Sequence, residues 1–228
     1  MKTVVLISAI AEWNAVKPLF PNARIQRFPF GECFDMVIHD EHISFFHSGW
    51  GKIASAGSMQ HVIDNYSPDL IVNLGTCGGF AGAANQGDII LVDKTYVYDI
   101  VELMGDLDVV SYYASSLDLS WLAEPYPFPV RRGLIASADS DLPPGKIPFL
   151  RSLGAIAADW ESAALAWVAQ RNGAFRPTRL LILRGVSDMV SEEGGEAYNN
   201  IEMFNERARA IMQQLIEQLP EWLNAVKL

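Results

Sequence analysis

The chain has 228 residues, of which 50% are hydrophobic and 19% are charged, and its formal net charge is −10 at pH 7. This composition indicates a globular protein that is long enough to bury a large core. Its excess of acidic residues disfavours binding to nucleic-acid phosphates. The two cysteines, Cys33 and Cys77, lack metal-ligand spacing and indicate a reducing compartment rather than a disulfide scaffold. We therefore expect a cytoplasmic protein with no metal and no nucleic-acid partner.

The N-terminal segment combines Lys2 with an apolar run from Val4 to Ala11, as short signal sequences do. The run is rich in β-branched residues, stops at Glu12 and is too short to span a bilayer. We interpret residues 3–9 as a first buried strand. No other segment approaches the roughly 20 apolar residues of a membrane helix, so we expect no membrane association.

Short β-rich runs alternate with helical patterns along the rest of the chain. This order predicts one α/β domain, residues 1–228, in which helices cover both faces of a mostly parallel central sheet as a three-layer sandwich. Two adjacent runs around Asp40 and Glu41 predict a hairpin, which makes the sheet mixed. Further strands are predicted at 34–39, 42–47, 70–74, 88–92, 130–137 and 180–183, helices at 53–66, 162–171 and 196–226, and an irregular proline-rich stretch at 111–129.

Polar residues are found at four places just after apolar runs or at a helix start, where α/β sheets bind ligands. They are Glu12, the segment "GTCGG" (75–79), the segment "DWESAA" (159–164) at the start of a helix, and Asp188 in "RGVSD". Each has a structural explanation. Glu12 and Glu161 could interact with helix dipoles, Asp188 could cap a helix, and the glycines could form a tight turn. The glycine segment is not GxGxxG and gives little support to a dinucleotide site.

Together, these motifs resemble the nucleoside phosphorylase and nucleosidase superfamily, most closely the nucleosidases of 5′-methylthioadenosine and S-adenosylhomocysteine. The resemblance implies the superfamily's fold and cleavage of the bond between a ribose and a purine base. It also implies a homodimer, and we expect no cofactor. It covers most of residues 1–188 through "LISAIAEW", "SGWGKIASA", "IVNLGTCGGF", "QGDIILVD", "RGLIASAD", "DWESAALAWVA" and "LRGVSD".

The superfamily attacks the sugar with either phosphate or water, and the two nucleophiles need different residues. Its phosphorylases carry one arginine two residues before the glycine-rich segment and another after the first strand. This chain has Asn73 and the segment around Glu12 at those places. A carboxylate there would repel phosphate but could accept a proton from water, so we predict a hydrolase. The alternatives are a phosphorylase with arginines from other positions and a nucleoside-binding protein without catalysis.

The resemblance also implies a role for each site residue. Asp188 corresponds to the general acid that protonates the leaving base, Glu12 to the base that activates water, and Glu161 to the acceptor of the ribose hydroxyls. We expect an apolar environment to raise the pKa of Asp188 and keep it protonated. The other predicted substrate contacts are Thr76, Gly78, Asp141, Trp160 and Ser187.

Two residues and one segment depart from the nucleosidase pattern. Trp160 stands where a methionine is common, and Asp141 stands where an aromatic residue stacks on the base. An acid cannot stack on adenine, so the pocket would borrow an aromatic residue such as Phe80 or accept another base. Residues 101–116, which would hold the 5′ substituent, do not clearly match either. Futalosine hydrolase, which removes hypoxanthine from a nucleoside with a bulky 5′ group, is therefore the second candidate. An enzyme that acts on another purine nucleoside is a further alternative.

Overall fold

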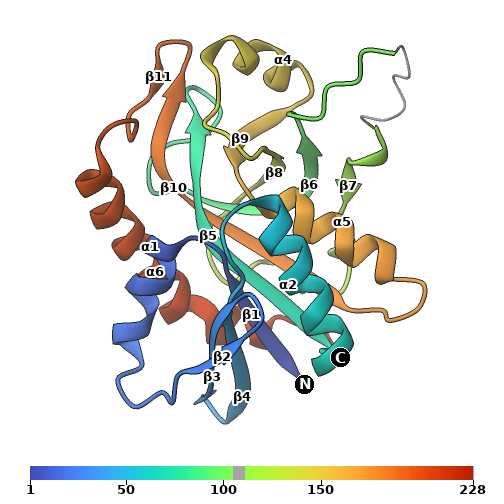
Figure 1. Ribbon diagram of the computed structural model, residues 1–228. Coiled ribbons are helices and arrows are strands. Elements are labelled where there is room, and N and C mark those ends of the chain that lie inside the picture. Colours follow the sequence, from blue (N-terminus) through green and yellow to red (C-terminus); the bar gives the residue numbers. More distant parts are fainter. Residues whose placement is uncertain (105–110, 228) are drawn as a thin grey trace.

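The computed structural model describes residues 1–104 and 111–227, within which eleven strands form one mixed sheet (Figure 1). The strand order is β11-β10-β6-β8-β9-β5-β1-β4-β3-β2, with β7 paired to β6. The strands are β1 (Thr3–Ile7), β2 (Gln26–Phe28), β3 (Gly31–Ile38), β4 (Glu41–His47), β5 (Leu70–Phe80), β6 (Ile89–Val97), β7 (Ser115–Ser116), β8 (Arg131–Ser137), β9 (Ala155–Asp159), β10 (Arg179–Ser191) and β11 (Gly194–Gly195).

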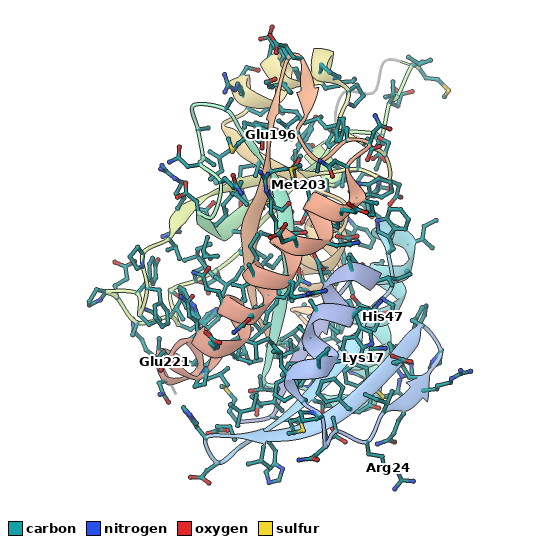
Figure 2. The ribbon with its side chains drawn as sticks, turned by 90° about the vertical axis from the view of Figure 1, so that its left-hand side faces the viewer. Lys17, Arg24, His47, Glu196, Met203 and Glu221 are labelled. Carbon is teal, nitrogen blue, oxygen red and sulfur yellow. The ribbon has the colours of Figure 1, made fainter. Side chains whose placement is uncertain are left out.

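Helices cover both faces of this sheet. One face carries α1 and α6, which lie side by side in Figure 2, and the other carries α2 and α5. The predicted α/β class, the layers and the mixed sheet are confirmed. None of the helices in the described part of the chain is both long and apolar enough to cross a membrane. The helices are α1 (Ile10–Val16), α2 (Gly51–Tyr66), α4 (Ile147–Ser152), α5 (Ser162–Asn172) and α6 (Ile201–Asn224).

Strand β1 shows how the two faces of the sheet are built. Its side chains alternate, so that Val5 and Ile7 join the core under α1 and α6, whereas Val4 and Leu6 join the core under α2 and α5. All four are fully buried. Because both faces are covered, the strand reads as a continuous apolar run in the sequence rather than as an alternating one.

Half of the sheet closes on itself, which the sequence pattern did not predict. Strand β10 pairs with β5 and with β6, β6 pairs with β8, β8 with β9, and β9 returns to β5. The strand at 155–159 was missing from the prediction, although it completes this ring. The ring brings the carboxyl ends of β6, β8 and β9 close to the carboxyl ends of β1 and β4, so that the segments after all five strands line one cavity.

Two strands are longer than predicted, which corrects the interpretation of two motifs. Strand β5 continues from Leu74 to Phe80, and β10 continues from Leu183 to Ser191. The segment "GTCGG" is therefore part of a strand rather than a turn. Asp188 likewise lies inside β10, so it does not cap a helix.

The two ends of the chain also differ from the prediction. The first strand ends at Ile7, and a short unpredicted helix, α1, begins at Ile10. Helix α6 begins at Ile201 rather than at 196, because the side chain of Asn200 accepts a hydrogen bond from the backbone N–H of Met203 and caps the helix there. The segment before α6 is left free to reach the edge of β10.

We predict that truncating the apolar face of α6 destabilises the fold. Leu215 is fully buried between this helix and the sheet, so Leu215→Ala should lower the free energy of unfolding by about 2–5 kcal/mol. Glu206→Ala on the exposed face of the same helix is the control and should change it by about 0.5 kcal/mol or less. Urea denaturation measures both. Equal effects of the two substitutions would contradict this account of the core.

Candidate functional site

A cavity of about 580 Å³ opens where the strand ends converge. Its walls come from the segments after β1, β4, β6, β8 and β9, from the middle of β5 and β10, and from the start of α6. The structure brings all eight predicted site residues to this cavity, although no contact with a substrate tests their roles. They are Glu12, Thr76, Gly78, Asp141, Trp160, Glu161, Ser187 and Asp188.

Glu12 is fixed by three hydrogen bonds although it is almost fully buried. Its Oε1 accepts from the backbone N–H of Thr76 at 2.6 Å and from the Thr76 hydroxyl at 2.8 Å, and its Oε2 accepts from the backbone N–H of Ala9 at 3.2 Å. The last bond gives a partner to the backbone N–H of Ala9, the N-cap residue of α1, which has no backbone acceptor within the helix. Burial raises the pKa of Glu12, with partial compensation from Arg184 and these bonds. Glu12 therefore caps the start of α1, and the same residue lines the cavity.

Arg184 is the residue that sequence reasoning missed. Its side chain is completely buried behind the cavity wall, and its Nε lies 3.0 Å from Asp159 Oδ2. Nη2 lies 3.7 Å from Glu161 Oε2, and Nη1 lies 4.0 Å from Glu12 Oε1. One cation thus serves three acids. An arginine at the end of a strongly apolar run, in a chain with acids after the other runs, was the available signal.

Asn73 and Gly75 on β5 make room for this guanidinium and hold it. Asn73 Oδ1 accepts a hydrogen bond from Arg184 Nη2 at 2.8 Å, while its amide donates to the carbonyl of Leu6. A Cβ on Gly75 would lie 2.0 Å from Arg184 Nη1 and 3.0 Å from Glu12 Oε1. Only glycine permits this approach, so Gly75 is explained by close packing rather than by a turn.

Asp159 anchors the other side of Arg184. Its Oδ1 accepts from the Ser137 hydroxyl at 2.5 Å, and its Oδ2 accepts from the hydroxyl of Ser162. The Ser162 hydroxyl also accepts from Arg184 Nε at 3.0 Å. These contacts tie β8, β9, the first residue of α5 and β10 into one polar network under the cavity.

Glu161 faces the cavity from the N-cap position of α5. Its Oε1 accepts from the backbone N–H of Gly51, at the start of α2, at 3.1 Å. Burial, with added repulsion from Asp159 and Glu12, raises the pKa of Glu161 to about 8 in spite of the nearby Arg184. Much of this carboxyl is therefore protonated near neutral pH.

Asp188 lies at a β-bulge in β10. The pairing with β5 shifts between Val186 and Asp188, so Ser187 is the extra residue. The Ser187 hydroxyl donates to Asp188 Oδ1 at 2.7 Å. Burial raises the pKa of Asp188, and the bonds from Ser187 and from the backbone N–H of Ala197 oppose this rise. The expected direction of the shift and its cause are therefore found in the structure.

Aromatic side chains among the described residues line the cavity, and Trp160 is the only one of them that the sequence predicted there. Trp160 is half-buried, and its ring centroid lies 4.8 Å from that of Trp50, which is 61% exposed. The suggestion that Phe80 supplies the missing aromatic surface was wrong, because Phe80 is fully buried in the core and does not reach the cavity. The aromatic lining residues are Trp50, Tyr98, Trp160, Tyr198 and Phe204.

Charge in the cavity is one-sided. Five acids line it, and none of its described lining residues is a lysine or an arginine. Within 1–104 and 111–227, no group of three potential metal ligands is found. The cavity therefore suits an uncharged or cationic ligand and disfavours a multiply charged anion. The acids are Glu12, Asp141, Asp159, Glu161 and Asp188.

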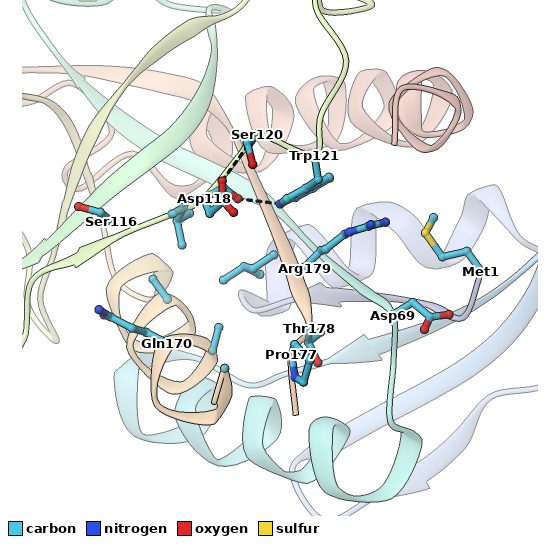
Figure 3. A pocket seen from close by; sticks show the side chains of 15 residues that line it. Met1, Asp69, Ser116, Asp118, Ser120, Trp121, Gln170, Pro177, Thr178 and Arg179 are labelled. Carbon is cyan, nitrogen blue, oxygen red and sulfur yellow. Dashed lines mark hydrogen bonds between the residues drawn. The ribbon is translucent and has the colours of Figure 1, made fainter. Parts of the chain in front are cut away.

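A second cavity, of about 850 Å³, lies near the start of β10 and lacks this chemistry (Figure 3). Its carboxylates already accept backbone hydrogen bonds, Asp69 from Lys2 and Asp118 from Ser120. Arg179 is directed toward the ring of Trp121, 5.8 Å from its centroid. Both carboxyl groups are exposed, whereas Glu12 and Glu161 are buried.

The sequence model of the Phosphorylase superfamily matches residues 6–220. The chain belongs to this superfamily. Its curated relatives include the 5′-methylthioadenosine/S-adenosylhomocysteine nucleosidases of Bacillus pumilus, 26% identical over 87% of this chain and 90% of the relative, and of Anoxybacillus flavithermus, 28% identical over 78% and 79%. The family predicted from the sequence is thus confirmed.

Solved structures of other proteins share the superfamily fold. The Streptococcus pneumoniae 5′-methylthioadenosine/S-adenosylhomocysteine nucleosidase, in complex with 8-aminoadenine, has a TM-score of 0.79 at 22% identity and covers 99% of this chain and 100% of its own. A mutant of futalosine hydrolase from Helicobacter pylori has a TM-score of 0.77 at 18% identity, with coverage of 97% and 100%. Both candidate activities are therefore represented among proteins with this fold.

We predict a pH-dependent stability that Glu161 controls. Because its pKa is higher in the folded chain than in the unfolded chain, the folded state binds the proton more tightly. Its contribution is complete below pH 4.5 and is lost as the pH rises through about 8. Glu161→Gln should therefore flatten the fall in unfolding free energy across this range. Urea denaturation at a series of pH values measures it, with exposed Glu206→Gln as the control; identical slopes for the two variants would refute the assignment.

Proposed function

We propose that this chain hydrolyses the N-glycosidic bond of a purine nucleoside similar to 5′-methylthioadenosine or S-adenosylhomocysteine. The observation that carries the proposal is the convergence of Glu12, Glu161 and Asp188 on one cavity, each with a raised pKa. The two curated relatives described above align with most of this chain, and both are named as 5′-methylthioadenosine/S-adenosylhomocysteine nucleosidases. A protein that only binds nucleosides would not need three buried acids.

Asp188 serves as the general acid in this proposal. As the bond between the sugar and the base stretches, negative charge grows on the base, and the protonated carboxyl transfers its proton to the five-membered ring. Burial favours the protonated form. The hydroxyl of Ser187 holds Oδ1, which fixes the orientation of the carboxyl group.

Glu12 and Glu161 act on the sugar. Water attacks the anomeric carbon while Glu12 takes its proton, so that the products are the free base and a ribose derivative. Glu161 accepts hydrogen bonds from the ribose hydroxyls, and the positive charge that develops on the sugar favours its ionised form. Thr76 orients Glu12 through two hydrogen bonds. Gly78 leaves room for the side chain of Val190 in the cavity wall, because a Cβ on Gly78 would lie 2.6 Å from Val190 Cγ2.

The residues of this cavity suit water as the nucleophile better than phosphate. A phosphate ion needs donors such as arginine that it can reach. Arg184 is fully buried, does not line the cavity and already faces three carboxylates. The described residues of the cavity wall include no lysine or arginine, so no basic side chain would bind the anion there. This arrangement favours the hydrolase over the phosphorylase alternative.

Hydrolysis of futalosine is the second candidate, and the pair of Trp50 and Trp160 favours it. Their indoles pack on each other with the ring planes tilted by 31°, and they form an aromatic surface next to Gly51, whose backbone holds Glu161. An apolar surface of this size suits a bulky group on the 5′ carbon of the sugar. Asp141, at the mouth of the cavity, offers no stacking surface for adenine. Residues 105–110, part of the expected 5′ region, lie outside the described residues.

A homodimer in the cytoplasm is part of the same proposal. Apolar side chains are exposed at Trp50, which lines the cavity and is 61% exposed, and at Ile53 in the first turn of α2, which is 87% exposed. Val101 and Leu103 are also exposed, at 65% and 89%. An exposed apolar surface of this kind supports contact with a second copy. Cys33 and Cys77 are free thiols, which fits a reducing compartment.

A panel of nucleosides tests the reaction type and the substrate together. The chain is incubated with 5′-methylthioadenosine, S-adenosylhomocysteine, inosine, adenosine and futalosine, each with and without phosphate, and released base is measured by chromatography. We expect base release that does not depend on phosphate and a sugar product without phosphate. Phosphate-dependent release would instead establish a phosphorylase, and tight binding without release would establish a binding protein.

Removing the proton of Asp188 should abolish turnover but spare binding. Asp188→Asn keeps the size of the side chain but cannot protonate the base, so we expect kcat to fall by at least ~100-fold. The dissociation constant measured by calorimetry should stay within about threefold. Asp118→Asn, which makes the same change in the second cavity, is the control. A rate close to that of the unmodified chain would show that another group supplies the proton.

A further inference from the structure

The bulge in β10 leaves the backbone around Asp188 in need of other partners. Ser187 has no opposite residue on β5, and only 1% of it is exposed. A buried carbonyl that the sheet does not pair must be satisfied elsewhere. Its partner is Arg207 of α6, whose Nη1 donates to the carbonyl oxygen of Ser187 at 3.0 Å.

The same arginine also reaches the other side of Asp188, through Glu196. Arg207 Nη1 donates to Glu196 Oε2 at 3.1 Å, and this oxygen accepts from the backbone N–H of Met189 at 3.3 Å. The backbone N–H of Glu196 donates in turn to the carbonyl of Met189 at 3.1 Å. Glu196 precedes α6, and Figure 2 shows it next to the N-terminal end of this helix, where Met203 is labelled. The ion pair therefore contacts the peptide groups on both sides of Asp188.

We propose that Arg207 is a positioning residue that, together with Glu196, clamps the bulge and fixes the orientation of the Asp188 carboxyl group. This inference rests on the proposed function, because it concerns the general acid of that reaction. The clamp also holds the segment after β10, whose Ala197 donates a backbone hydrogen bond to Asp188. Tyr198 in this segment lines the cavity and donates to the carbonyl of Leu142 at 3.1 Å.

The ion pair between Arg207 and Glu196 is partly exposed to solvent, so its main contribution is to position Asp188 rather than to stabilise the fold. The side chains of Arg207 and Glu196 are 26% and 49% exposed, and ion pairs in such places contribute little to the stability of a fold. Their value lies in the two backbone contacts next to the acid. Misplacing a catalytic group by about an ångström can cost 100-fold in rate, even when the fold survives.

Kinetics of three variants test the clamp, with the nucleoside of the panel that the unmodified chain cleaves fastest. Arg207→Met should lower kcat about tenfold or more and change KM by less than about threefold, because the acid acts in the transition state. Arg207→Lys should recover part of the loss. Arg209→Met removes the same charge from an exposed position on the same helix and should leave kcat unchanged.

The pH profile provides a readout that a purely structural role would not change. Groups facing Asp188 are Ser187 on β10, Cys77 on β5, Tyr198, Glu196 and Arg207. Because Asp188 must be protonated to act, the rate falls as the pH rises through its pKa. Arg207 lowers this pKa, so Arg207→Met should move the alkaline limb to higher pH, whereas Arg209→Met should not move it.

A double-mutant cycle keeps the inference testable if one variant folds poorly. Glu196→Ala alters an exposed turn, and its loss of kcat should not add to that of Arg207→Met, because both remove the same clamp. Fully additive losses would overturn the inference. So would equal kcat values for Arg207→Met and Arg209→Met.

Hydrogen exchange distinguishes failure of the clamp from failure of the proposed function. Amide exchange in the peptide 185–200, measured by mass spectrometry on the full chain, should be faster in Arg207→Met than in Arg209→Met. If the unmodified chain cleaves no nucleoside, the proposed function fails, and this comparison alone decides the clamp. Unchanged exchange would overturn the clamp, as would faster exchange with an unchanged kcat.

Discussion

The buried guanidinium of Arg184 is the interaction on which the acidic cavity depends. Carboxylates lose most of their hydration when they are buried, and a group of them without a counter-charge would be strongly destabilising. Arg184 contacts Asp159 at 3.0 Å and lies within 4.0 Å of both Glu12 and Glu161. Because Arg184 lies behind the wall rather than in the cavity, it neutralises the acids without blocking a ligand. The raised pKa values of Glu12 and Glu161 show that the neutralisation is incomplete.

The closed half of the sheet explains how distant segments reach this guanidinium. Arg184 and Asp188 come from β10, whereas Glu12 comes from the helix after β1 and Glu161 from the turn between β9 and α5. Only the pairing of β5 with both β9 and β10 brings these segments together. Glycine at position 75 of β5 then lets the guanidinium pass close to the strand. The topology and the charge network therefore depend on each other.

The cavity separates the chemistry of the reaction from the choice of substrate. The acids are held by hydrogen bonds to backbone groups of rigid elements, as with Glu12 on Thr76 and Ala9 and Glu161 on Gly51. The aromatic surface, in contrast, comes from the half-exposed pair of Trp50 and Trp160 and from the segment before α6. Such surfaces change more easily than a buried ionic network. This difference fits a superfamily in which one fold serves several nucleosides.

The sequence by itself determined the α/β class, the layers, most of the strands and the acids of the site. Apolar runs report burial directly, and polar residues that interrupt them report the ligand-binding edge of the sheet. Tertiary structure alone decided three further features: the ring closed by 155–159, the position of Asp188 at a bulge, and the burial of Arg184 among acids up to 172 positions away along the chain. Pairing partners and register depend on contacts between segments that are distant in sequence, and no local pattern records them. Trp50 and Tyr198 were not predicted for the same reason, because they meet the cavity only through the fold.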